Sequence, residues 1–167
     1  PGVELCIGRA EYPPDDRRVM IALTPVVNDA VATVGELGEE GLRVRAAGDV
    51  IRTMVRMLAA GVVTVDVQPL MSRDTGEVVF IDMTEARVLS SPPTFLDLAN
   101  AGNFVAEMLG LIPESLSEVA STVLLEELKE VQARGETIDQ EVYGILIGNT
   151  NIIKGEALRL IESHCDL

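Results

Sequence analysis

Residues 61–88, GVVTVDVQPLMSRDTGEVVFIDMTEARV, constrain the fold of this chain most strongly, because two aspartates there each follow an apolar run. The run VVTV leads into Asp66, and the β-rich run EVVFI leads into Asp82. Between them DTG is a turn signal, so the pattern predicts a β-hairpin that carries one carboxylate near each end. Carboxylates placed in this way suit a divalent metal, since Mg²⁺ is commonly held by one or two carboxylates together with substrate phosphates.

The same stretch resembles the catalytic and metal-binding loops of the protein-kinase-like fold, where a helix, a catalytic Asp, a short hairpin and a second Asp follow one another. DVQPLM, which begins at Asp66, lies over the family pattern D-L-K-P-x-N, and IDMT, which contains Asp82, lies over I-D-F-G. Thr64 stands in place of the family's His, Met71 in place of its metal-binding Asn, and MT in place of Phe-Gly. The resemblance implies an α+β fold, namely a mainly helical kinase-like large lobe with two short β-hairpins.

The resemblance also implies roles for five residues. Asp82 would hold Mg²⁺ on the phosphates of ATP, and Asp66 would orient or deprotonate an acceptor hydroxyl. Gln68, where the family often has Lys, would contact the γ-phosphate as a neutral donor. Leu23 and Val26 would belong to a hinge that borders the adenine pocket. The implied cofactors are ATP and Mg²⁺, and the implied reaction is phosphoryl transfer.

Two parts that kinases use to hold phosphate are not found in the sequence. There is no Gly-rich loop that would cover the phosphates and no strand Lys that would pair with them. The glycines of VGELGEEGL are not spaced as GxGxxG and are mixed with carboxylates, so this segment is predicted to be a flexible acidic loop. We therefore expect reduced activity, or activity that depends on a protein partner or a missing small-lobe segment.

Two other functions remain open. One is a non-catalytic, pseudokinase-like domain, because phosphoryl transfer depends on positioning and charge neutralisation that this sequence only partly supplies. The other is an acidic α+β interaction domain, which a large exposed apolar patch on the C-terminal helices would indicate.

At 167 residues the chain is predicted to form a single domain that can bury a core. We divide it into a hairpin and hinge-like segment (1–26), a helix with the catalytic-type hairpin and a loop (43–111), and a helical part (113–167). Apolar residues at spacings of three and four predict helices over 43–58, 95–111, 115–134, 138–147 and 152–163. Strands are predicted over 3–7 and 18–23, a loop at SSPP, and an N-terminal capping box at Thr137.

Charge and composition narrow the possible partners. The net charge is -14, from 27 acidic and 13 basic side chains, so the average surface repels nucleic acids and anionic lipids. No apolar run approaches the roughly 20 residues of a membrane span. The two cysteines are too few for a disulfide framework, and we expect a reducing, cytoplasmic location. The single His, four residues from the end, fits neither a Ser/His/Asp triad nor a zinc site.

Overall fold

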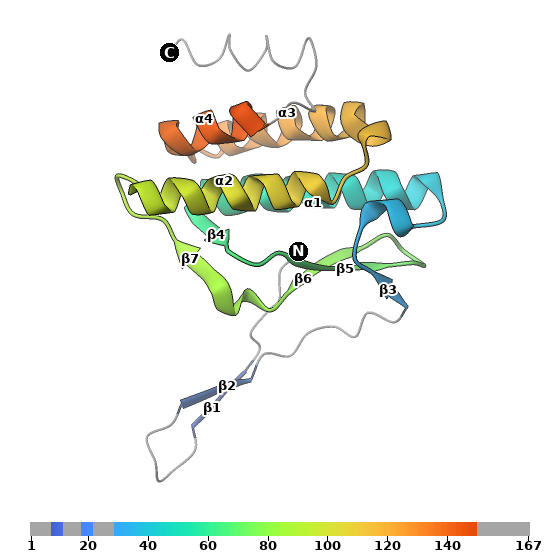
Figure 1. The fold of residues 1–167 in the computed structure, drawn as a ribbon, viewed down its shortest axis with the longest axis horizontal. Helices are drawn as coiled ribbons and strands as arrows, with labels where there is room; N and C mark the ends of the chain where they lie inside the picture. The colour runs from blue at the N-terminus through green and yellow to red at the C-terminus, as the bar shows by residue number, and fades with distance from the viewer. Residues whose placement is uncertain (1–7, 12–17, 22–28, 150–167) are drawn as a thin grey trace.

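The chain folds into helices and short antiparallel strands, which confirms the predicted α+β class (Figure 1). The computed structural model describes residues 8–11, 18–21 and 29–149, with side chains in the last range. The α-helices are α1 (Glu40–Ala59), α2 (Phe95–Gly110), α3 (Ser117–Ala133) and α4 (Gln140–Asn149). Short 3₁₀ helices are η1 (Val34–Glu36), η2 (Met83–Glu85) and η3 (Glu114–Leu116). The strands are β1 (Gly8–Glu11), β2 (Arg18–Ile21), β3 (Ala30–Val31), β4 (Val62–Thr64), β5 (Gln68–Ser72), β6 (Val78–Ile81) and β7 (Ala86–Val88).

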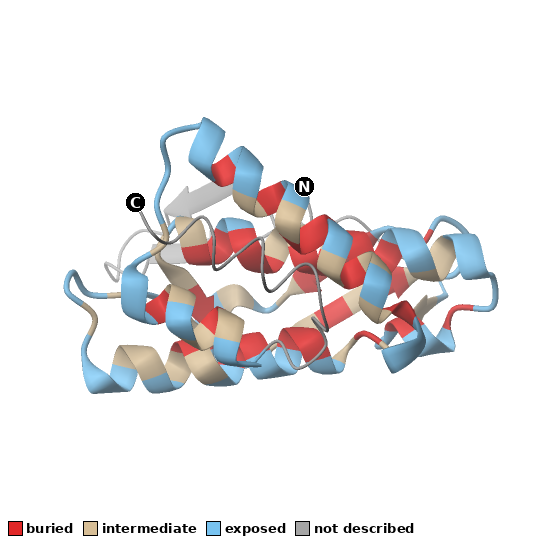
Figure 2. Ribbon diagram, turned by 90° about the horizontal axis from the view of Figure 1, so that it is seen from above, coloured by how far each residue is buried: buried red, intermediate tan, exposed pale blue. Residues whose placement is uncertain are grey.

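The helices are stacked in two layers above the strands (Figure 1). α3 and α4 form the outer layer, in which α3 packs on α1 and α4 packs on α2. β4 contacts both α1 and α2 from the other side. Buried residues occupy the helix faces that are turned inward (Figure 2), and they form a cluster to which every layer contributes. Burial of this apolar surface is the main favourable contribution to folding.

The helix predictions are confirmed wherever the structure describes the chain. Each end of α1 to α4 lies within three residues of its predicted position. The predicted N-cap of α4 is wrong, because the helix begins later and the carboxylate of Asp139 accepts from the backbone N–H of Glu141 at 2.9 Å. β2 confirms the strand predicted over 18–23, whereas the strand at 3–7 and the helix at 152–163 lie outside the described residues.

The pairing of the strands around the two aspartates differs from the predicted hairpin. β6 pairs with β5, so that Ile81 lies opposite Gln68, and β4 pairs with β7. The sequence predicts residues 62–65 as the partner of residues 77–81, and that pairing is wrong. β5 pairs with residues 78–81 instead, because β5 alternates between buried and half-buried residues and a short turn joins it to β6.

The segment VGELGEEGL is not the flexible acidic loop that the sequence predicts. Val34 and Leu37 are both buried in the core, and Glu36 lies in η1 between them. The carboxylate of Glu36 accepts from the backbone N–H and the hydroxyl of Thr33, each at 2.9 Å. The hydroxyl of Thr33 is the main reason that the pKa of Glu36 is lowered. Val34 and Leu37 pack this turn into the core next to α1, and the N–H of Val34 also donates to the carbonyl of Leu111 at 3.2 Å.

Candidate functional site

Asp66 and Asp82 lie in two short loops that face each other. The first loop, residues 65–67, joins β4 to β5, and the second, residues 82–85, joins β6 to β7. We call them the facing loops. The paired strands β4 and β7 hold the two loops together at one end, and the paired strands β5 and β6 hold them together at the other. The register therefore brings the two aspartates to the same end of the β5–β6 hairpin, although neither residue belongs to a strand.

Asp66 is held by hydrogen bonds between its backbone and Thr64, and by a hydrogen bond between its side chain and Gln68. Thr64 is buried, and its hydroxyl donates to the carbonyl of Asp66 at 3.0 Å and accepts from its N–H at 3.4 Å. The side-chain amide of Gln68 donates to Oδ2 of Asp66. The carboxylate of Asp66 itself is exposed, so a ligand can approach it. Thr64, where the resemblance expects His, thus fixes the bend of the loop.

Asp82 adopts a backbone conformation that is uncommon for a residue with a side chain. Its φ is 53° and its ψ is 56°, in the left-handed region, where a non-glycine residue is typically disfavoured by roughly 1–2 kcal/mol. Its Oδ1 accepts from the hydroxyl of Thr84 at 2.6 Å, and the side chain is exposed. Among the described residues only Asp29 shares a positive φ without being glycine. Such conformations are concentrated at functional sites, where the surrounding structure maintains them.

A third carboxylate, from α2, supports the first facing loop. Oε2 of Glu107 accepts from the backbone N–H of Val67 at 3.3 Å, which joins the loop to a helix forty residues further along the chain. The sequence analysis missed Glu107, because a single exposed acid in an apolar helix has no motif around it. Its only signal is that it is the one charged residue after Asp97 in α2.

The electrostatics of the site are acidic. Asp66, Asp82, Glu85 and Glu107 all contribute carboxylates, and Glu85 lies 3.6 Å from Arg87. Residues 62–72 and 77–86 contain no Lys or Arg. Carboxylate oxygens suit Mg²⁺, but no group of three or more His, Cys, Asp or Glu side chains in the described part of the chain could hold a metal. The two aspartates therefore fit Mg²⁺ only if phosphate oxygens of a ligand complete its coordination.

Of the remaining residues of the resemblance, the structure describes Met71 and Gln68. Met71, at the position where the family has a metal-binding Asn, is fully buried in β5 and packs in the core. Gln68 is half-buried next to Asp66. Leu23 and Val26, predicted to border an adenine pocket, lie outside the described residues.

A hollow of about 630 Å³ lies elsewhere, between the end of α1 and the end of α3. Arg56 and Arg134 line it together with Glu136. Arg56 donates to both carboxylate oxygens of buried Glu127, at 2.6 Å from Nε and 3.2 Å from Nη2, and this bond raises the pKa of Arg56. Arg134 donates to both oxygens of Glu136 at 3.1 Å. Both guanidinium groups are thus paired with carboxylates: Arg56 joins α1 to α3 through Glu127, whereas Arg134 pairs with residues of α3 itself and of the segment directly after it.

Comparison with known proteins identifies no relative: no family model, curated protein or solved structure matches the chain. Within the described residues, no single helix is both long and apolar enough to cross a membrane. Phe95–Gly110 and Glu114–Ala133 meet that criterion only as a pair, which is bent by 92°.

Proposed function

We propose that this chain is a kinase-like domain that binds a nucleotide with Mg²⁺ through Asp66 and Asp82. The observation that carries the proposal is the placement of both aspartates in the facing loops, with Asp82 in a left-handed backbone conformation. Two exposed carboxylates at one end of a hairpin are the oxygen ligands that Mg²⁺ accepts alongside phosphate. The reducing interior of a cell, where nucleotides and Mg²⁺ are found, is the location that fits this role.

Each residue of the site would have a separate role. Asp82 would hold the metal ion, which when bound would neutralise phosphate charge. Asp66 would accept a hydrogen bond from an acceptor hydroxyl and orient it, while the amide of Gln68 keeps the Asp66 carboxylate in place. Glu107 would act as a positioning residue, because it holds the loop at Val67 rather than a substrate.

The charge of the site limits its activity. A nucleoside triphosphate brings several negative charges to a chain of net charge -14 whose facing loops contain no cation. Phosphoryl transfer relies on positive charge placed around the transferred group. Slow turnover by the isolated chain follows, as does faster turnover when a protein partner or a small-lobe segment supplies a Lys or Arg.

Thermal unfolding in the presence of ATP and Mg²⁺ tests the proposal. Ligand at five times its dissociation constant stabilises a protein by about 1 kcal/mol, which raises the Tm of a domain of this size by roughly 2–4 °C. The wild-type chain and an Asp74→Asn variant should both show this rise, because Asp74 lies in the turn at the other end of the hairpin. Asp82→Asn should abolish it. No Mg²⁺-dependent rise in the wild-type chain, or an equal rise in Asp82→Asn, would refute the proposal.

A second candidate is a pseudokinase-like domain that binds a nucleotide, or only a protein, without transferring phosphate. The buried side chain of Met71 favours it, because a second metal ligand cannot come from this position. Single-turnover measurements with radiolabelled ATP separate the two functions. Transfer that Asp66→Asn and Asp82→Asn both abolish supports the enzyme, whereas Mg²⁺-dependent binding without transfer supports the pseudokinase-like domain.

A further inference from the structure

The solvent face of α2 differs from those of the other long helices. Its exposed residues are Phe95, Leu96, Ala99, Asn103, Ala106, Glu107 and Gly110, of which one is charged. The exposed residues of α3 are Glu118, Thr122, Glu126, Lys129, Glu130, Gln132, Ala133, of which four are charged. A surface helix normally places charged and polar residues on its outer face. The face of α2 is therefore unusual in that it turns apolar and small residues to solvent.

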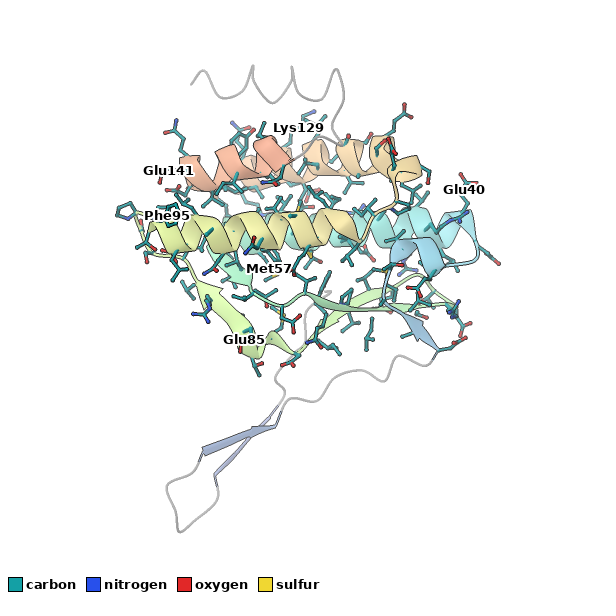
Figure 3. All side chains as sticks on the ribbon, in the orientation of Figure 1. Glu40, Met57, Glu85, Phe95, Lys129 and Glu141 are labelled. Atoms are coloured by element: carbon teal, nitrogen blue, oxygen red, sulfur yellow. The ribbon has the colours of Figure 1, made fainter. Side chains whose placement is uncertain are left out.

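Two large apolar side chains, Phe95 and Leu96, begin this face, and a third, Val88, ends the strand that precedes it in the chain. Phe95 is 89% exposed, Val88 78% and Leu96 63%, well above every other large hydrophobic residue among those whose burial is described. Figure 3 shows Phe95 projecting from the end of α2, away from the helices. The N–H of Ser90 donates to Asp97 at 3.4 Å, which joins the segment after Val88 to the first turn of α2. We call Val88, Phe95 and Leu96 the α2 apolar end.

The backbone beneath this surface is fixed. The hydroxyl of Thr94 accepts from the N–H of Asp97 at 3.2 Å, and the carboxylate of Asp97 accepts from the N–H of Thr94 at 2.8 Å. The two bonds form a capping box, which satisfies N–H groups at the start of the helix. Phe95 and Leu96 are therefore exposed on an ordered helix end. A partner that binds them would not have to pay the entropic cost of ordering this backbone.

We propose that the α2 apolar end docks a segment of another protein that presents apolar side chains flanked by Lys or Arg. Two consecutive large apolar side chains that are both well over half exposed favour an interaction that covers them. Aromatic side chains such as Phe are large, rigid contacts that are enriched where proteins meet. This inference does not depend on the nucleotide proposal, because the α2 apolar end includes no residue of the facing loops.

Charge decides between the possible occupants. α2 carries Asp97 and Glu107, α4 beside it carries Glu141, and neither helix has a Lys or Arg. The nearest cation in the sequence, Arg87, is already paired with Glu85. A second copy of this acidic chain, or an anionic lipid surface, would bring like charges together, whereas a basic segment would be attracted.

Fluorescence anisotropy with a synthetic peptide tests the proposal on the full chain. The probe is a short fluorescein-labelled peptide of leucine and lysine, with the leucines at helical spacing, and its match has glutamate in place of lysine. The basic peptide should bind and the acidic one should not. Phe95→Ala and Leu96→Ala should each weaken binding by about 30-fold if the two residues are central contacts. Val44→Ala, which removes another exposed apolar side chain from α1, should leave binding unchanged.

Several outcomes would overturn the proposal. Equal binding of both peptides, or equal loss in Val44→Ala and Phe95→Ala, would show that contact is not at the α2 apolar end. Sedimentation that reveals a dimer sensitive to Phe95→Ala would assign the surface to a second copy, and binding to phosphatidylserine vesicles with the same sensitivity would assign it to a membrane. Binding that appears only after deletion of residues 150–167 would show that this chain covers its own surface. Far-UV circular dichroism of each variant checks that exposed-residue substitutions leave the fold intact.

Discussion

Replacement of Gly76 by alanine tests how the hairpin of the candidate site is attached to α1. Gly76 has a φ of 68°, and a Cβ placed there would lie 2.8 Å from the carbonyl oxygen and 3.1 Å from the Cα of Leu42. The left-handed backbone disfavours alanine by roughly 1–2 kcal/mol. Forcing an atom against a helix backbone adds about 1–3 kcal/mol, as overpacking does in cores. We expect Gly76→Ala to lower the free energy of unfolding by about 2–5 kcal/mol.

Two other glycines separate these contributions. Gly61 and Gly135 have φ values of 66° and 71°, but no atom lies within 4 Å of a Cβ placed at either position. Gly61→Ala and Gly135→Ala should therefore show the backbone cost alone, about 1–2 kcal/mol. Equilibrium unfolding in urea measures all three variants, with the midpoint and slope compared with those of the wild type. If Gly76→Ala were no more destabilised than Gly61→Ala, the close approach of the turn to α1 would be wrong.

Three further predictions concern charged groups. Glu127→Gln should lower the free energy of unfolding by about 1–3 kcal/mol in urea, because it removes the charge from the acceptor of both Arg56 bonds and leaves only Glu130, at 3.9 Å, as an ion-pair partner of Arg56. Thr94 lowers the pKa of Asp97 from 3.8 to about 2, so the stability that Asp97 contributes is present above pH 3.8 and is lost as the pH falls through 2. The difference in Tm between wild type and Asp97→Asn should accordingly shrink over that range. Glu107→Gln should speed amide exchange at Val67 several-fold, since a neutral acceptor replaces a charged one.

The helices could be predicted from the sequence because their apolar residues recur with the period of a helix. In α1, buried Val50, Ile51, Met54, Val55 and Leu58 follow that period. β7 could not be predicted, since ARV is only three residues long and alternates weakly, and its partner β4 lies more than twenty residues earlier in the chain. Short strands of this kind are selected by tertiary packing rather than by propensity.

The candidate site, like the fold, could be predicted from the sequence only in part. The pattern of residues 61–88 predicts a hairpin between the two aspartates with one carboxylate near each end. A hairpin is present, but β5 forms it with β6, and the register places Asp66 and Asp82 at the same end. The hydrogen bond from Val67 to Glu107 could not be predicted, because it joins residues forty positions apart without a motif. Positions within a motif are local information, whereas the groups that hold the motif in place come from elements that only the fold brings near.

Met71 shows where alignment to a family and packing lead to opposite expectations. By alignment, Met71→Asn would restore a metal ligand and strengthen Mg²⁺-dependent nucleotide binding. In the structure the side chain is fully buried among core residues, so Asn would lose the burial of Met and leave an amide without partners. We expect Met71→Asn to lower the free energy of unfolding by about 3–5 kcal/mol, and Met71→Leu by less than about 1.5 kcal/mol. Urea unfolding and titration with ATP and Mg²⁺ decide the matter. A stable Met71→Asn variant that binds the nucleotide more tightly would show that this side chain faces the aspartates and not the core.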